Sequence, residues 1–176
     1  MEHSNQRLIL MSRNAVMEYG GILEQLFAQC HCTERFSVCS FEDFNEHLHV
    51  GTPYLAVLNS RQDCLEAGVL PTQTAVCVMD YDLAQQTDVG NAEHTRILTY
   101  SAYNDCADFT ARNVHCMAEF GCAFEIVGVG VIGRIKLRTA DAQDVQTALL
   151  GASVCLACGV PFAEVLASLN LLAVEV

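Results

Sequence analysis

Positive charge is scarce in this sequence. Nine Lys and Arg residues, with Lys136 as the one lysine, stand against 21 Asp and Glu residues, and the net charge is −12. Proteins that bind nucleic acid neutralise phosphates with a basic surface, and the sequence shows no such footprint. We therefore expect no nucleic-acid partner, and an anionic membrane surface is disfavoured for the same reason.

Long apolar runs and the residue pattern of a signal peptide are also missing from this sequence. No apolar run reaches about 18 residues, the length that a membrane-spanning helix needs. The first residues, MEHSNQRLIL, lack the basic-then-apolar order of a signal peptide. We therefore expect a cytoplasmic protein. Its apolar share of 52% is high and favours burial of surface against a partner.

Cysteine, by contrast, is abundant, with ten residues. Without a signal peptide we expect reduced thiols rather than a disulfide framework. The stretches CHC at 30–32 and CLAC at 155–158 have the close spacing of metal-binding or redox pairs. The second lies inside an apolar helical pattern, where a thiol packs as a small hydrophobic group. Packing is therefore the predicted role of these and the other cysteines, and no metal site is expected.

The order of apolar patterns predicts alternating strands and helices. Helical spacing predicts helices at about 15–29, 41–48, 141–156 and 161–170, and Ser40 is placed to cap the second. Apolar residues spaced by two around the Gly128–Gly130 turn predict a β-hairpin over about 120–138. Such alternation is typical of an α/β fold. Buried strands are expected at 7–11, 36–39, 54–58, 75–79 and 97–100.

Two stretches resemble the central domain of Mur ligases, the ATP-dependent amide-forming enzymes of peptidoglycan precursor synthesis. ADFTARNV at 107–114 fits the family pattern AD-x-x-A-x-N-[IV], and ALLGASVCLACGVPFAEVLASL at 148–169 resembles a helix pair of that domain. The resemblance covers residues 76–170. It implies one P-loop-type domain over 1–176, with a mainly parallel sheet, helices on both faces and an antiparallel edge hairpin. We expect no counterpart of the family's UDP-sugar-binding N-terminal domain or of its C-terminal substrate domain.

The family's nucleotide-binding motifs are replaced in this chain. Where the family reads TGTNGKT after the first strand, Ser12 and Ala15 stand for glycines, Val16 for the lysine and Met17 for the magnesium-binding hydroxyl, while Asn14 matches. A working P-loop needs the glycines, the lysine and the hydroxyl to hold phosphates and Mg²⁺. ATP binding is therefore not expected, and no cofactor is assigned.

Two further family motifs are also altered. The family's Asp-His pair is missing after Asn59, where the chain reads SRQDCLEAGVL. In the segment that resembles the adenine-contacting motif, Asp144 and Thr147 replace asparagines. Asp80 and Asp82 follow a predicted strand, where carboxylates either bind a metal or cap the next turn or helix. Capping is the predicted role.

These features favour a non-catalytic protein, with no catalytic residue assigned. We hypothesise a role in protein association or regulation, linked to cell-wall precursor metabolism. One alternative is a small-molecule-binding protein or enzyme that uses the crevice at the strand ends, where Ser12, Arg13, Asn14, Asn59 and Arg61 are expected. Another is a subunit of a split ATP-dependent ligase. A homodimer or a protein partner is expected, through the helices from 143 onward or the hairpin edge.

Overall fold

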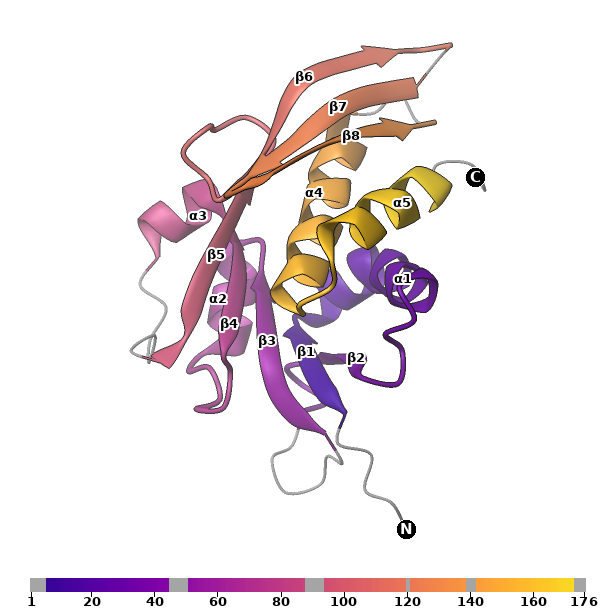
Figure 1. Cartoon of the computed structure of the whole chain (residues 1–176). Coiled ribbons are helices and arrows are strands. Elements are labelled where there is room, and N and C mark those ends of the chain that lie inside the picture. The colour runs from indigo at the N-terminus through magenta and orange to yellow at the C-terminus, as the bar shows by residue number, and fades with distance from the viewer. Residues whose placement is uncertain (1–5, 45–50, 88–93, 120, 139–141, 173–176) are drawn as a thin grey trace.

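The computed structural model describes residues 6–44, 51–87, 94–119, 121–138 and 142–172 (Figure 1). Eight strands form one sheet in the order β2-β1-β3-β4-β5-β6-β7-β8. The strands are β1 (Arg7–Met11), β2 (Phe36–Ser40), β3 (Thr52–Leu58), β4 (Val76–Asp80), β5 (Arg96–Ser101), β6 (Phe109–Met117), β7 (Gly121–Gly128) and β8 (Val131–Leu137). The helices are α1 (Arg13–Gln29), α2 (Arg61–Ala67), α3 (Tyr81–Gln86), α4 (Ala142–Ala157) and α5 (Phe162–Leu172).

The sheet has a parallel part and an antiparallel part. Strands β1 to β6 pair in parallel, whereas β6, β7 and β8 pair antiparallel with one another. The predicted α/β class, the five parallel strands and the edge hairpin are therefore confirmed. The hairpin turns at Gly130, whose φ of +75° is a left-handed conformation that glycine adopts without strain.

Helices cover both faces of the parallel part (Figure 1). The larger core lies between the sheet and α1, α4 and α5, and includes Ile9, Val57, Phe124 and Leu149. A smaller core lies under α2 and α3, around Leu58, Met79 and Leu83. Residues 148–155 of α4 are all buried, as their apolar pattern predicts. No helix among the described residues is both long and apolar enough to cross a membrane.

Local differences from the expected elements have simple causes. After β2, residues 41–43 form a turn in which the Ser40 hydroxyl accepts the Asp43 N–H, and the rest of the predicted helix at 41–48 lies outside the described residues from 45 onward. The two short helices α2 and α3 follow β3 and β4 directly. Each begins at a strongly capping side chain, Ser60 and Asp80 respectively.

One expectation about cysteine is wrong. Cys116 and Cys122 form a disulfide that joins β6 to β7. The two residues are direct cross-strand partners in the antiparallel register, which brings their side chains together. The predicted packing role is confirmed for the buried free cysteines and is wrong for Cys106, which is exposed. Five of the free cysteines are buried in the two cores, namely Cys30, Cys32, Cys77, Cys155 and Cys158.

Candidate functional site at the strand ends

The carboxyl ends of the parallel strands are where an open α/β sheet binds its ligands. In this chain Ser12 follows β1, Asn59 follows β3, Asp80 ends β4 and Ser101 ends β5. The N-termini of α1, α2 and α3 point into the same region, because at most two residues separate each helix from the strand before it. Their N–H groups are the usual anchors for a bound phosphate.

At α1, these N–H groups are capped by the chain itself. Ser12 is the single residue between β1 and α1 and is fully buried. Its hydroxyl accepts the Ala15 N–H at 3.1 Å, and its carbonyl accepts the Val16 N–H at 2.9 Å. Residues 14–17, which the sequence resemblance places at a phosphate-binding motif, therefore lie in the first turns of a helix. One residue is too short a connection to wrap around phosphates.

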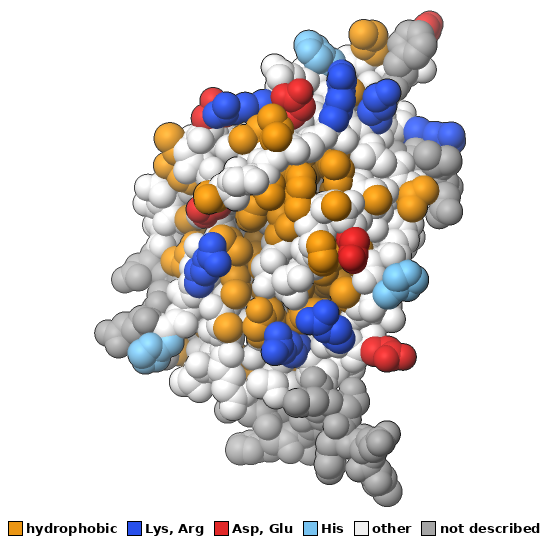
Figure 2. Space-filling view, viewed as in Figure 1, with side chains coloured by type: hydrophobic (Ala, Val, Ile, Leu, Met, Phe, Trp, Pro, Cys, Tyr) orange, Lys and Arg blue, Asp and Glu red, His pale blue; other side chains and the backbone are white. Residues whose placement is uncertain are grey.

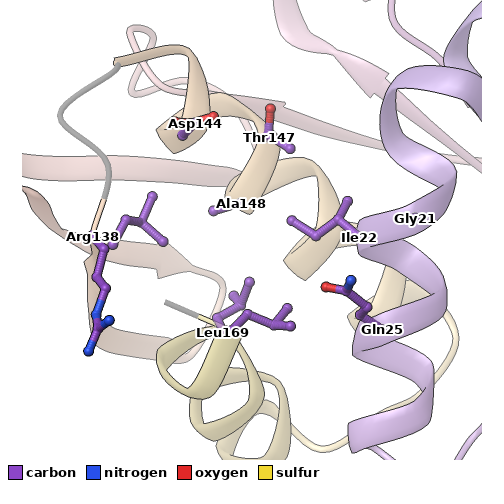
Figure 3. Close-up of a pocket in the computed structure, with 10 residues that line it drawn as sticks. Gly21, Ile22, Gln25, Arg138, Asp144, Thr147, Ala148 and Leu169 are labelled. Carbon is purple, nitrogen blue, oxygen red and sulfur yellow. The ribbon is translucent and has the colours of Figure 1, made fainter. Parts of the chain in front are cut away.

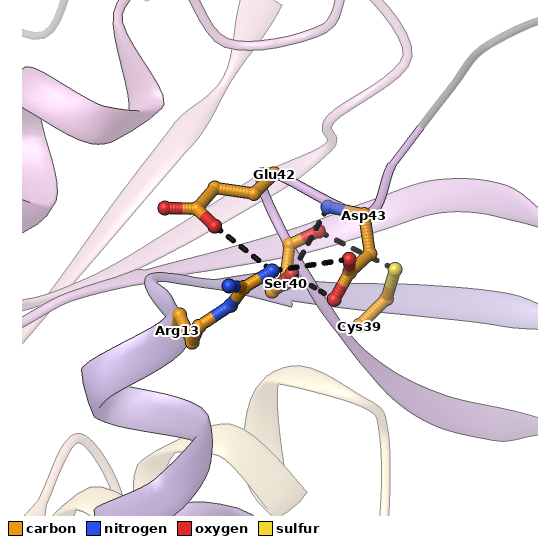
Figure 4. A network of polar contacts seen from close by, with 5 residues as sticks. All are labelled: Arg13, Cys39, Ser40, Glu42 and Asp43. Atoms are coloured by element: carbon orange, nitrogen blue, oxygen red, sulfur yellow. Dashed lines mark hydrogen bonds and ion pairs between the residues drawn. The ribbon is translucent and has the colours of Figure 1, made fainter.

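Arg13, at the first position of α1, faces away from the sheet centre (Figure 4). Its guanidinium lies 2.9 Å from Glu42 and 3.4 Å from Asp43 beyond the end of β2. Ser40 also donates to Asp43, at 2.6 Å. Asn14 is exposed on α1. Arg13 thus ties α1 to the end of the neighbouring strand.

The end of β3 carries a buried polar network. Asp63 is 5% exposed, and its Oδ2 accepts the N–H groups of Asn59 and Ser60 at 2.7 and 2.9 Å. Together with the Ser60 hydroxyl it forms a capping box on α2. Asn59 accepts the Tyr100 hydroxyl at 2.7 Å, while its Nδ2 is buried and has no hydrogen-bond partner among the described residues. Arg61 turns outward and donates to Gln86 of α3.

Both carboxylate oxygens of Asp80 accept hydrogen bonds from the protein. Oδ1 accepts the N–H groups of Asp82 and Leu83, which confirms the predicted capping role. Oδ2 accepts Nε2 of Gln146, 3.0 Å away on α4. The Gln146 Oε1 in turn accepts the Ala102 N–H at 2.9 Å. Gln146 thereby ties α4 to the ends of β4 and β5.

The electrostatic character of the crevice is acidic. Burial raises the pKa of Tyr100 well above its usual value, and the nearby carboxylates of Asp80, Asp63 and Glu18 act in the same direction. Burial also raises the pKa of Tyr19, helped by its hydrogen bond with Glu18. A bound triphosphate would face these carboxylates, while Arg13 and Arg61 are held by other side chains. Among the described residues, no three His, Cys, Asp or Glu side chains are placed to hold a metal ion.

A separate cavity of about 540 Å³ lies between α1, α4, α5 and the end of β8 (Figure 3). Ile22, Gln25 and Leu169 point into it, and Asp144 lies at its edge. Thr147 also lines the cavity. Asp144 and Thr147 therefore line this cavity, whereas Gln146 faces the strand ends. None of the five expected crevice residues lines it.

The sequence did not reveal three residues of this network. Asp63 could have been found, because Ser60-x-x-Asp63 has the spacing of a capping box. The contacts of Tyr100 with Asn59 and of Gln146 with Asp80 could not have been found in this way, since the paired residues lie 41 and 66 positions apart along the chain.

No protein-family model matches the chain, and no curated protein matches its sequence. Solved structures do match. UDP-N-acetylmuramoyl-L-alanyl-D-glutamate–2,6-diaminopimelate ligase has a TM-score of 0.74 over 94% of this chain and 46% of its own, at 12% identity. The murein peptide ligase Mpl from Psychrobacter arcticus has a TM-score of 0.66 over 95% of this chain and 47% of its own, at 13% identity. MurF ligase from Thermotoga maritima, in complex with ADP, has a TM-score of 0.63 over 93% of this chain and 48% of its own, at 11% identity.

This is the fold of the Mur ligase central domain. The chain spans about half the length of these ligases. At such low sequence identity the Mur-ligase-like description applies to the fold alone. What the strand ends do must therefore be argued from their own residues.

Proposed function

We propose that this chain is a non-catalytic domain with a Mur-ligase-like fold that acts by associating with protein, either a second copy or another chain. We place this role beside the synthesis of peptidoglycan precursors, the process served by ligases that share the fold. The observation that carries the proposal is the one-residue connection between β1 and α1. Ser12 fills the place of a phosphate-binding loop and caps the helix that would otherwise meet the phosphates.

Three further features of the site support the same conclusion. The helix starts at the other strand ends are capped in the same way, by Asp63 and Ser60 on α2 and by Asp80 on α3. Val16 and Met17 supply neither the cation nor the hydroxyl that a phosphate and Mg²⁺ need. The carboxylates around Tyr100 oppose a polyphosphate. The polar groups at the strand ends thus serve folding.

Calorimetry with Mg-ATP tests the proposal. We expect no saturable heat at ATP concentrations up to the millimolar range, because the N–H donors at the helix starts are capped and Val16 stands where a lysine is needed. A micromolar dissociation constant would overturn the proposal.

The Nδ2 of Asn59 favours a second candidate function. It is a buried donor without a partner at the strand ends, where a small ligand carrying an acceptor oxygen could satisfy it. This candidate predicts that a nucleotide or UDP-sugar raises the melting temperature of the wild-type protein and not that of Asn59→Ala. An unchanged melting temperature across such a screen would count against it.

A further inference from the structure

The basic residues of this acidic chain are unevenly placed. Residues 109–138, which form β6, β7 and β8, contain four of the nine basic residues and two of the 21 acidic ones. The net charge of these three strands is therefore positive, although the net charge of the whole chain is −12. Figure 2 shows Lys and Arg side chains along the upper end of the molecule, where Figure 1 places these strands.

Two of the basic residues lie in a row on β8. Arg134 and Lys136 are spaced by two, so their side chains lie roughly 7 Å apart on one side of the strand, whereas Arg138 follows the strand and lines the cavity beside α4 and α5. The intervening residues face α5: Ile135 is buried, and a Cβ at Gly133 would touch Leu166 and Phe162. The row thus points to the opposite face, and both of its residues are exposed.

No helix covers this face of the hairpin among the described residues, since α2 and α3 pack chiefly on β3, β4 and β5. The row also lacks carboxylate partners within the described chain, where ion pairs within 4.0 Å join Arg13 and Arg112 to acidic residues. Glu125 is the cross-strand neighbour of Arg134, but Asn113 donates to it at 2.7 Å from β6. Ile132, 67% exposed, extends the row with an apolar side chain.

We propose that the outer face of β8, with Arg134, Lys136 and Ile132, is the docking surface for an acidic protein. This rests on the proposed function, since it names where association with another protein takes place. A second copy bound symmetrically here would bring like charges together, which is unfavourable. Addition of a strand to the β8 edge is also hindered. The Asn170 side chain on α5 already accepts the Lys136 N–H and donates to the Arg134 carbonyl.

Fluorescence anisotropy with labelled poly-L-glutamate tests this surface. We expect saturable binding to the wild-type chain at low salt that weakens as salt is added. The pair Arg134→Gln/Lys136→Gln should weaken it roughly five- to tenfold. The matched pair Arg35→Gln/Arg96→Gln removes the same charge elsewhere and should leave the affinity within about twofold. Poly-L-glutamine, which has no charge, should not bind.

Three outcomes would contradict the proposed docking surface. They are no binding of poly-L-glutamate, equal weakening by both pairs of substitutions, and tighter binding of a DNA duplex than of poly-L-glutamate. None of them bears on nucleotide binding, which the Mg-ATP calorimetry measures separately. Failure of the docking surface and failure of the proposed function are therefore distinguishable.

Discussion

At the scale of single residues, the polar groups at the strand ends are occupied by the chain's own backbone. Ser12, Asp63 and Asp80 each accept N–H groups at the start of a helix. In nucleotide-binding α/β proteins such N–H groups hold phosphate. Replacing these side chains should therefore change stability, and the size of that change measures how far each one contributes to folding.

Asp63→Ala should lower the free energy of unfolding by about 1–3 kcal/mol, because it leaves the N–H groups of Asn59 and Ser60 without an acceptor in a buried place. Asp82→Ala is the matched control, since Asp82 is exposed in the first turn of α3. It should change stability by less than about 0.5 kcal/mol. Urea unfolding followed by circular dichroism measures both, and equal effects would refute the structural role of Asp63.

The buried thiols predict a loss of stability at alkaline pH. Burial raises the pKa of Cys77 from 9.0 to about 12. Above pH 9 the thiol of the unfolded chain loses its proton first, so the unfolded state binds fewer protons and the free energy of unfolding falls until about pH 12. Between pH 9 and 10 this thiol should account for about 1 kcal/mol of the fall.

Urea unfolding at these pH values tests that slope. The free energy of unfolding of Cys77→Ala should fall less steeply with pH than that of the wild type. That of Cys106→Ala should fall as steeply as the wild type, because Cys106 is exposed. If both variants fall as steeply as the wild type, Cys77 does not titrate as described.

At the scale of elements, the antiparallel hairpin is fixed by close backbone contacts. Gly121 and Gly130 both have positive φ, +78° and +75°. A Cβ at Gly121 would collide with the backbone of Leu137 and Arg138, while a Cβ at Gly130 would meet no atom within 4 Å. Only Gly121 therefore combines a special conformation with a lack of space.

Gly130→Ala should cost about 1 kcal/mol of stability, from the conformation alone. Gly121→Ala should cost about 3 kcal/mol or more, because β7 and β8 must also separate. Hydrogen exchange of the β8 amides distinguishes a local from a global loss. Equal costs for the two substitutions would contradict the close approach at Gly121.

The elements also show what the sequence can and cannot predict. Long apolar patterns predicted α1, α4 and the parallel strands, because their burial depends on local periodicity. The helices α2 and α3 are seven and six residues long, too short for a periodic signal, and their caps were the only clue. The Cys116–Cys122 disulfide depends on the register between β6 and β7, which residue spacing does not determine.

At the scale of the whole molecule, the exposed apolar residues point to self-association. Figure 2 shows hydrophobic side chains gathered in the middle of the face seen there. On α5, Ala163, Ala167 and Leu171 are exposed and recur at a spacing of four, so they share one side of the helix. The edge of β8 is the less suitable surface, because Asn170 occupies part of it. We therefore expect the C-terminal helices to form the contact in a homodimer.

Static light scattering at micromolar concentration decides this expectation. The wild-type chain should have about twice the mass of a single 19.2 kDa chain. Leu171→Glu places a charge on the shared apolar side of α5, where Leu171 is 55% exposed, and should weaken the dimer at least about tenfold. Leu65→Glu on α2, where the side chain is 75% exposed, is the matched control and should remain dimeric. A wild-type mass near 19.2 kDa that does not change with concentration would rule out self-association, and association would then require a different protein.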